Sequence, residues 1–126
     1  MIKRKGGNKY GAKKTEIDNI KFDSKVEAQF YEYIKSLKDK GEVLEFECQP
    51  KYLLQDSFKH NGKTIRKIEY IADFRVVYAN GEEWVYDIKG MKPLPDNIIK
   101  VKMLKYLNRD INFSYVKWYR KEWVYF

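Results

Sequence analysis

The chain has 126 residues, a formal net charge of +8 and 44% hydrophobic residues. This length is enough for one domain with a single core, and the hydrophobic content excludes a disordered chain. The excess of Lys and Arg favours a polyanionic partner such as nucleic acid, and a basic surface without a partner is the alternative.

Cys48 is the only cysteine, so the chain has neither an intrachain disulfide nor a cysteine-type zinc site. A lone thiol fits a reducing cytoplasm. The basic N-terminus lacks the apolar stretch of a signal peptide, and no segment approaches the roughly 20 apolar residues of a membrane span. No GxxxxGK phosphate loop is present. We therefore expect a cytoplasmic protein with no membrane partner and no nucleotide cofactor.

Residues 1–14 are basic, contain glycine and lack periodicity, which predicts a flexible basic arm before a single domain over residues 15–126. Residues 15–22 favour a short extended segment around Asp18-Asn19. A helix then begins at Ser24, because Ser24 and Glu27 have the spacing of a capping box. Apolar residues recur at helical intervals after it, and Gly41 is a stop signal.

Strand-like segments follow this helix. Residues 43–49 alternate, and residues 51–55 continue that strand or pair with it after Pro50. We interpret residues 57–64 as a polar turn and Lys67–Tyr78 as one long strand rich in Ile, Val, Phe and Tyr. Residues 83–89 form the return strand of a hairpin.

The C-terminal third predicts a second helix and a last strand. A loop over residues 90–95 precedes a helix capped by Asp96 or Asn97, and residues 112–118 form the strand. The apolar stripe of that helix consists of Ile98, Val101, Leu104 and Leu107. An aromatic tail over residues 119–126 is a candidate dimer surface. The order helix, three or four strands, helix, strand predicts an α/β fold with a mixed sheet flanked by helices.

Charged residues interrupt two of the predicted strands. Asp73 lies in Tyr70-Ile71-Ala72-Asp73-Phe74, and Asp87-Ile88-Lys89 ends the return strand. Burying a carboxylate without a partner costs several kcal/mol, so two such residues indicate a functional role. Two carboxylates and a lysine joined by a hairpin form a candidate divalent-metal site, and a plain cross-strand salt bridge is the alternative.

The turn at Asn80-Gly81 tests this hypothesis. A two-residue turn puts Asp73 opposite Ile88, so its side chain points away from Asp87. If Gly81 takes the left-handed position after a type I turn, the loop has three residues and Asp73 faces Asp87 directly. Opposed residues have Cβ atoms about 5 Å apart, a separation that one metal ion bridges. The metal-site hypothesis therefore predicts the three-residue loop, or a β-bulge that has the same effect.

Mg²⁺, with Mn²⁺ as its substitute, prefers oxygen ligands. We expect Asp73, Asp87 and the carbonyl of Ile88 to bind it, with Glu27 as a third acid that ligates directly or through water. Glu27 also fits a capping role beside Ser24, and the two roles are compatible. Lys89 either orients or deprotonates the attacking water or neutralises charge on the phosphate.

Candidate DNA contacts lie on the arm, beside Pro50 and on the second helix: Lys9, Lys13, Lys14, Gln49, Lys51, Lys100 and Lys102. Five aromatic residues are expected in the hydrophobic core: Tyr52, Phe74, Trp84, Tyr86 and Tyr106. A further group either stacks on bases or forms a dimer surface: Tyr10, Trp118, Tyr119 and Trp123. His60, in a polar turn, is expected at the surface.

With these residues in place, the chain resembles the PD-(D/E)xK nuclease superfamily, also called restriction-endonuclease-like. The resemblance implies a helix–three-strand–helix–strand core. It also implies that Glu27, Asp73 and Asp87 are metal-site acids and that Lys89 is the catalytic lysine. Ala72 stands where the superfamily usually has proline.

More closely, the chain resembles a family of small phage- and prophage-encoded proteins described as endonucleases or Holliday-junction-resolvase-like. The segments that carry this resemblance are Lys9–Lys14, Phe22–Ala28, Gln49-Pro50, Tyr70–Phe74 and Asp87–Gly90. It implies a Mg²⁺-dependent DNA endonuclease that acts on branched or recombining phage DNA in a bacterial host, with a homodimer to cut both strands. A non-catalytic DNA-binding module on the same fold is the alternative, and a structural role with protein partners is a third.

Overall fold

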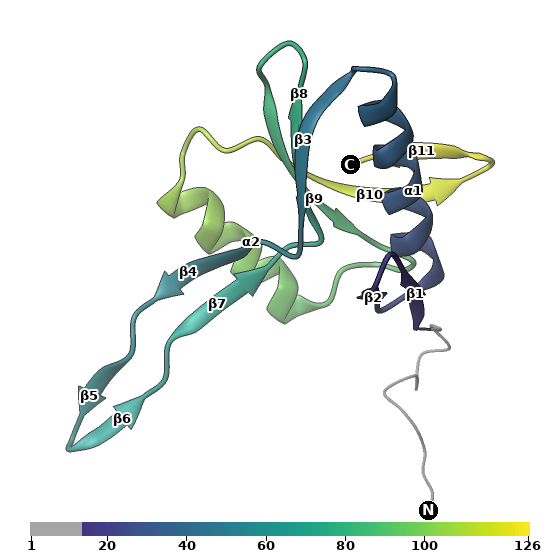
Figure 1. The fold of residues 1–126 in the computed structure, drawn as a ribbon. Helices are drawn as coiled ribbons and strands as arrows, with labels where there is room; N and C mark the ends of the chain where they lie inside the picture. Colours follow the sequence, from purple (N-terminus) through teal and green to yellow (C-terminus); the bar gives the residue numbers. More distant parts are fainter. Residues whose placement is uncertain (1–13) are drawn as a thin grey trace, which may run out of the picture.

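The computed structural model describes residues 14–126, so the predicted flexible arm, except Lys14, lies outside the described residues. A five-stranded sheet forms the centre of the molecule, with strand order β11-β10-β9-β8-β3 (Figure 1). β10 runs parallel to β9, and the other pairs are antiparallel. The strands are β3 (Val43–Cys48), β8 (Phe74–Tyr78), β9 (Glu83–Ile88), β10 (Phe113–Tyr119) and β11 (Glu122–Tyr125).

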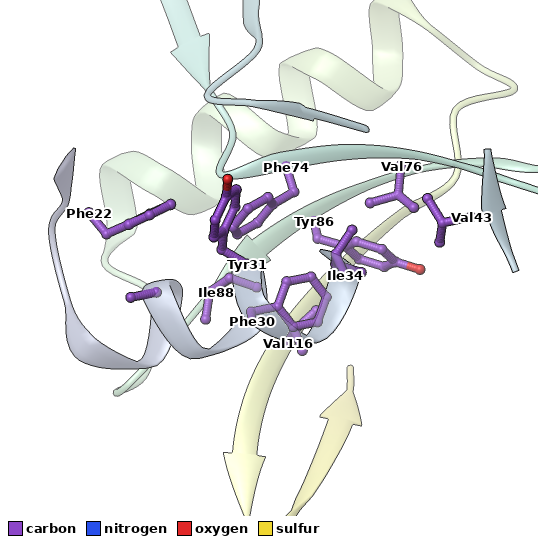
Figure 2. Close-up of a cluster of buried hydrophobic side chains, with 11 residues drawn as sticks. Phe22, Phe30, Tyr31, Ile34, Val43, Phe74, Val76, Tyr86, Ile88 and Val116 are labelled. Carbon is purple, nitrogen blue, oxygen red and sulfur yellow. The ribbon is translucent and has the colours of Figure 1, made fainter. Parts of the chain in front are cut away.

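Helix α1 (Lys25–Asp39) covers one face of the sheet. It begins where predicted, because the Oγ of the N-cap Ser24 accepts a hydrogen bond from the N–H of Glu27 at 3.2 Å. Phe30 and Ile34 of α1 are fully buried against Phe74 and Val76 of β8 (Figure 2). Burying each such side chain contributes about 1.5–3 kcal/mol, so this cluster anchors α1 and fixes where its first turn lies.

Helix α2 (Pro95–Leu107) covers the opposite face. Val101 and Leu104 pack there with Val85 of β9, while the neighbouring Tyr86 packs on the α1 side. This alternation along β9 follows from the two-residue period of a strand. The predicted α/β class with a mixed sheet is therefore confirmed. No helix within residues 14–126 is long and apolar enough to cross a membrane.

The β8–β9 hairpin has the register that the metal-site hypothesis requires. The N–H of Tyr78 donates to the carbonyl of Glu82 at 2.8 Å, and Gly81 takes a left-handed φ of +91°. The loop is therefore three residues long, with Gly81 in the position where a side chain is strained. The paired residues end at Phe74 and Tyr86. The N–H of the next residue, Asp73, also donates to the carbonyl of Tyr86 at 3.0 Å, so Asp73 lies next to Asp87 at the end of the ladder.

The single long strand predicted over Lys67–Tyr78 is wrong, because the chain breaks at Ala72-Asp73. β7 (Ile68–Ile71) pairs with β4 (Lys51–Gln55), whereas β8 pairs with β3 and β9. At the break, the N–H of Ala72 still donates to Pro50, and that of Asp73 donates to the carbonyl of Tyr86. The backbone thus changes partners between these two residues, which the uniform run of β-forming side chains did not reveal.

The polar turn predicted over residues 57–64 is also wrong, because it forms a second hairpin. β5 (Phe58–His60) pairs with β6 (Lys63–Ile65) around Asn61-Gly62, both with left-handed φ values of 50° and 77°. Together with β4 and β7 it forms an extension over residues 51–71, here called the β-ribbon, which projects from the body (Figure 1). His60 is exposed, as predicted.

The remaining short strands, β1 (Thr15–Ile17) and β2 (Ile20–Phe22), form a hairpin around the predicted Asp18-Asn19 segment. The C-terminal tail is not loose, because β11 pairs with β10 and the ring of Trp123 lies 4.9 Å from that of Phe30. Trp123 is therefore half-buried and packs against the core cluster. Lys121 lies in the tight turn between the two strands.

Helix α2 departs from its prediction at both ends. It begins at Pro95 after an N-cap Leu94 that makes no side-chain cap bond, so neither Asp96 nor Asn97 caps it. Of the four residues predicted for its apolar stripe, Ile98 and Leu107 are exposed. Only Val101 and Leu104, in the middle of the helix, are buried. Tyr106 is 68% exposed and is not a core residue.

Candidate active site

Asp73 lies at the break between β7 and β8, where the β-ribbon leaves the main sheet. Its Oδ2 accepts a hydrogen bond from the N–H of Ile88 at 2.7 Å. The side chain therefore bonds to the neighbouring strand at the residue that follows Asp87. Ile88, a predicted carbonyl ligand, ends β9 and is buried.

Asp87 is 4% exposed and forms an ion pair with Lys89, whose Nζ lies 3.1 Å from Oδ1. The two side chains share a face because they are two residues apart at the end of a strand. The Nζ of Lys89 also lies 6.0 Å from the centre of the Tyr115 ring on the adjacent strand β10. A buried carboxylate is thus compensated by a lysine whose charge is partly shielded from water.

Two further groups hold the other oxygen of Asp87, and the sequence analysis missed both. The hydroxyl of Tyr70 on β7 donates to Oδ2 at 2.5 Å, and the side-chain amide of Asn97 on α2 donates to it at 3.1 Å. The hydroxyl of Tyr115 donates in turn to the Oδ1 of Asn97 at 2.8 Å. The side chain of Asn97 thus hydrogen-bonds to Asp87 instead of capping α2. This contact depends on how α2 packs on the sheet.

Glu27 reaches the site from the first turn of α1. The hydroxyl of Ser24 donates to its Oε2 at 3.3 Å. The Asp73 and Asp87 carboxyls are close enough to influence the pKa of Glu27. The capping contact and the approach to Asp73 occur together, so the two predicted roles are compatible in geometry. The sequence-predicted acids therefore come from α1, the β7–β8 break and β9.

Burial and crowding disfavour the charged forms of two of these acids. Burial, followed by the charge of Asp23, raises the pKa of Glu27 to about 7. Burial raises the pKa of Asp73 well above its usual range, and the charges of Glu27 and Asp87 add to the effect. A cation or protons must compensate such a concentration of negative charge.

The donor chemistry of this site fits a hard divalent cation. Asp73, Asp87 and Glu27 offer carboxylate oxygens, the ligands that Mg²⁺ and Mn²⁺ take. Within residues 14–126, however, no three His, Cys, Asp or Glu side chains already stand together as a group able to hold a metal ion. The carboxylates instead bond to Lys89, Tyr70, Asn97 and the Ile88 N–H.

The predicted DNA contacts are distributed unevenly around this site. Gln49 is next to it, because its N–H donates to the carbonyl of Asp73 at 2.9 Å, and its left-handed φ of 56° marks a sharp bend after β3. Lys51 is exposed at the start of β4. The other candidates are Lys14 and Lys102, both exposed, Lys100, half-buried on α2, and Lys9 and Lys13, which fall outside the described residues.

Comparison with curated proteins finds no match for the chain. A family model described as a protein of unknown function, DUF1064, matches residues 7–122. This span includes both helices and the residues that form the site described above, Glu27, Asp73, Asp87 and Lys89. The chain therefore belongs to the DUF1064 family of proteins of unknown function.

Proposed function

We propose that the protein is a metal-dependent DNA endonuclease that hydrolyses phosphodiester bonds. The observation that carries this proposal is the Asp87–Lys89 pair at 3.1 Å, with Asp73 bonded to the residue between them at 2.7 Å. A structural salt bridge alone does not need a second buried acid, and Glu27 adds a third negative group nearby.

A restriction-endonuclease-like core is part of the proposal. In chain order the relevant elements are α1, β3, β8, β9, α2 and β10, a helix–three-strand–helix–strand succession. Their strands are neighbours in the sheet, and the extra strand β11 lies at the edge. Asp73 precedes the second of these strands, and Asp87 lies on the third, as the resemblance to that superfamily implies.

We propose that Asp73, Asp87, Glu27 and the carbonyl of Ile88 hold Mg²⁺, or Mn²⁺ in its place. When bound, such a cation polarises a phosphodiester and increases the acidity of nearby water. The protein supplies the negative cluster that attracts the cation, and Tyr70 and Asn97 orient Asp87 through its Oδ2. Orientation of a ligating carboxylate by hydrogen bonds of this kind supports metal affinity.

Lys89 is the proposed catalytic lysine. Beside Asp87 it has two possible actions: it neutralises charge that develops on the phosphate, or it orients the attacking water and accepts its proton. Neutralising charge uses the ammonium form, which the ion pair with Asp87 holds next to the acids. Accepting a proton requires the neutral amine at the same position.

DNA is the proposed substrate because the chain carries a net charge of +8. Part of this charge lies on the tip of the β-ribbon, where Lys59, Lys63 and Arg66 are exposed. Branched or recombining phage DNA in a bacterial cytoplasm is the proposed setting. A homodimer is the proposed active form because a junction is cut on two strands.

Cleavage of branched, duplex and single-stranded DNA with Mg²⁺ tests the proposal. We expect Mg²⁺-dependent cuts that EDTA abolishes, and losses of at least ~100-fold in Lys89→Ala and Asp73→Asn. Lys40→Ala and Asp39→Asn are matched controls, because these exposed residues lie at the other end of α1. DNA binding without cleavage under all conditions would identify a non-catalytic module instead.

A further inference from the structure

A groove opens beside Lys89, where the ends of β9 and β10 meet the first turn of α1. It has a volume of about 610 Å³. This volume lies within the roughly 300–1,000 Å³ of pockets that enclose small organic ligands. Lys89 belongs both to this groove and to the candidate active site, so a molecule in the groove lies next to the reacting groups.

The lining of the groove is basic and aromatic. Its charged side chains are all lysines: Lys25, Lys89, Lys92 and Lys117. Its aromatic side chains are Trp118, Tyr119 and Phe126, which are 40–51% exposed. Lysines bind phosphate, and exposed rings offer faces on which bases stack, so the combination complements a nucleotide chain.

The aromatic rings connect the groove to the active site in a continuous series. The Tyr115 ring, which lies 6.0 Å from the Lys89 Nζ, is stacked on the Phe126 ring at 5.5 Å. The Lys117 Nζ lies 5.3 Å from the Phe126 ring and 5.4 Å from the Tyr119 ring. Positive charge and ring surface therefore alternate from Lys89 outwards, a pattern typical of channels for single strands.

The turn beside these aromatics is also basic. Tyr119 pairs with Glu122 across a two-residue turn formed by Arg120 and Lys121, with φ values of 52° and 65°. Such turns favour Asn-Gly, because left-handed backbone is strained for long side chains. Two basic residues thus occupy the tip despite a local conformational cost.

We propose that this groove binds one or two unpaired nucleotides of the DNA by stacking and delivers the adjacent phosphate to Lys89. This inference rests on the proposed nuclease function and narrows its substrate to DNA with an unpaired segment at the cut. A fully paired duplex keeps its bases stacked inside the helix, so it leaves the rings of the groove unused.

The test measures binding in EDTA, so that it does not depend on cleavage. The probes are a fluorescent duplex with a short single-stranded tail, the same duplex with abasic sites in the tail, and a blunt duplex. Fluorescence anisotropy gives each Kd. We expect the wild type to bind the intact tail about 10-fold more tightly than the abasic tail, the effect of losing base stacking.

Two tyrosines provide a matched pair of variants. Tyr119 and Tyr106 are both exposed and both contact an arginine, at 5.0 Å and 4.8 Å, but only Tyr119 lines the groove. We expect Tyr119→Ala to lose the preference for the intact tail, Tyr119→Phe to keep it, and Tyr106→Ala to behave as wild type. Equal Kd values for intact and abasic tails in the wild type would overturn the inference.

The remaining outcomes separate this inference from its alternatives. Base discrimination in EDTA without any cleavage in Mg²⁺ contradicts the nuclease function and supports the groove. Cleavage in Mg²⁺ without base discrimination supports the nuclease function and contradicts the proposed role of the groove. If sedimentation shows that Tyr119→Ala dissociates a dimer while base discrimination is unchanged, the groove is a contact between subunits and the inference is wrong.

Discussion

Glu27 shows how a single side chain links folding to the proposed chemistry. Its pKa of about 7 lies above the ordinary value of 4.5 because burial and neighbouring acids disfavour its charge. A raised pKa contributes stability below the unfolded value, and this contribution is lost as the pH rises through the folded value. Above pH 7, without a cation, an ionised Glu27 therefore strains the site.

Replacing Glu27 by Gln removes this penalty. In EDTA we expect Glu27→Gln to raise the Tm at pH 8 by about 5 °C, since the ionised carboxylate costs on the order of 1–2 kcal/mol. At pH 5 the folded wild type is protonated and only ionisation of the unfolded chain, near the ordinary value of 4.5, still favours unfolding, so the gain is smaller than at pH 8. Scanning fluorimetry at both pH values measures it, with the exposed Glu32→Gln as control. Equal gains at the two pH values would contradict the burial argument.

The candidate acids and lysine could be identified from the sequence because they interrupt apolar strands. Asp73 and Asp87 stand out in this way, and the hairpin turn makes their opposition a testable consequence. The two groups that donate hydrogen bonds to Asp87 could not be predicted from the sequence. Tyr70 looks like any strand aromatic and Asn97 looks like a helix cap, and their role depends on how α2 packs on the sheet.

Among the elements, the β8–β9 turn has the most direct effect on the site. Gly81 has a φ of +91°, and a Cβ added there meets no atom within 4 Å, so only backbone strain opposes a side chain. Gly81→Ala is expected to cost about 1–2 kcal/mol and several degrees in Tm. Gly90→Ala is a matched control, because a Cβ at Gly90 also meets open space without positive φ. A fully stable Gly81→Ala protein would show that this loop geometry is not required.

The β-ribbon is a separate element with a separate expected function. Lys59 and Lys63 are exposed near its tip, so their removal leaves the core intact. If both contact phosphates, Lys59→Ala/Lys63→Ala reduces the slope of log K against log salt by about 2. Titrations of duplex DNA at several salt concentrations measure this slope. Lys38→Ala/Lys40→Ala on α1 is the control, and equal changes in both variants would assign the effect to net charge alone.

The strand partners at the base of the β-ribbon were harder to predict than helix α1, for a physical reason. The cap at Ser24 and the apolar spacing of α1 are local signals, and the helix lies where they indicate. The exchange of partners at Ala72-Asp73 depends on β3, β4 and β9, which are distant in sequence. Local β propensity carries no information about which strand supplies the hydrogen bonds.

At the scale of the whole molecule, the apolar core and the candidate active site occupy different parts of the fold. The cluster between α1 and the sheet is apolar (Figure 2), whereas the acids gather where the β-ribbon, the α1 N-terminus and the end of β9 meet. The class of the fold followed from element order, because a helix on each face of a mixed sheet satisfies both apolar faces. The sequence did not predict the groove, since its walls come from α1, the segment after β9 and both ends of the β10–β11 hairpin.

The central claim is that Asp73, Asp87 and Glu27 together bind a divalent cation. Calorimetric titration of Mn²⁺ at pH 8 tests it most directly, without DNA or activity. We predict saturable binding by the wild type, at least about 10-fold weaker binding by Asp73→Asn and Asp87→Asn, and unchanged binding by the exposed Asp39→Asn. Equal Mn²⁺ affinity in all four proteins, or no binding by the wild type, would contradict the account.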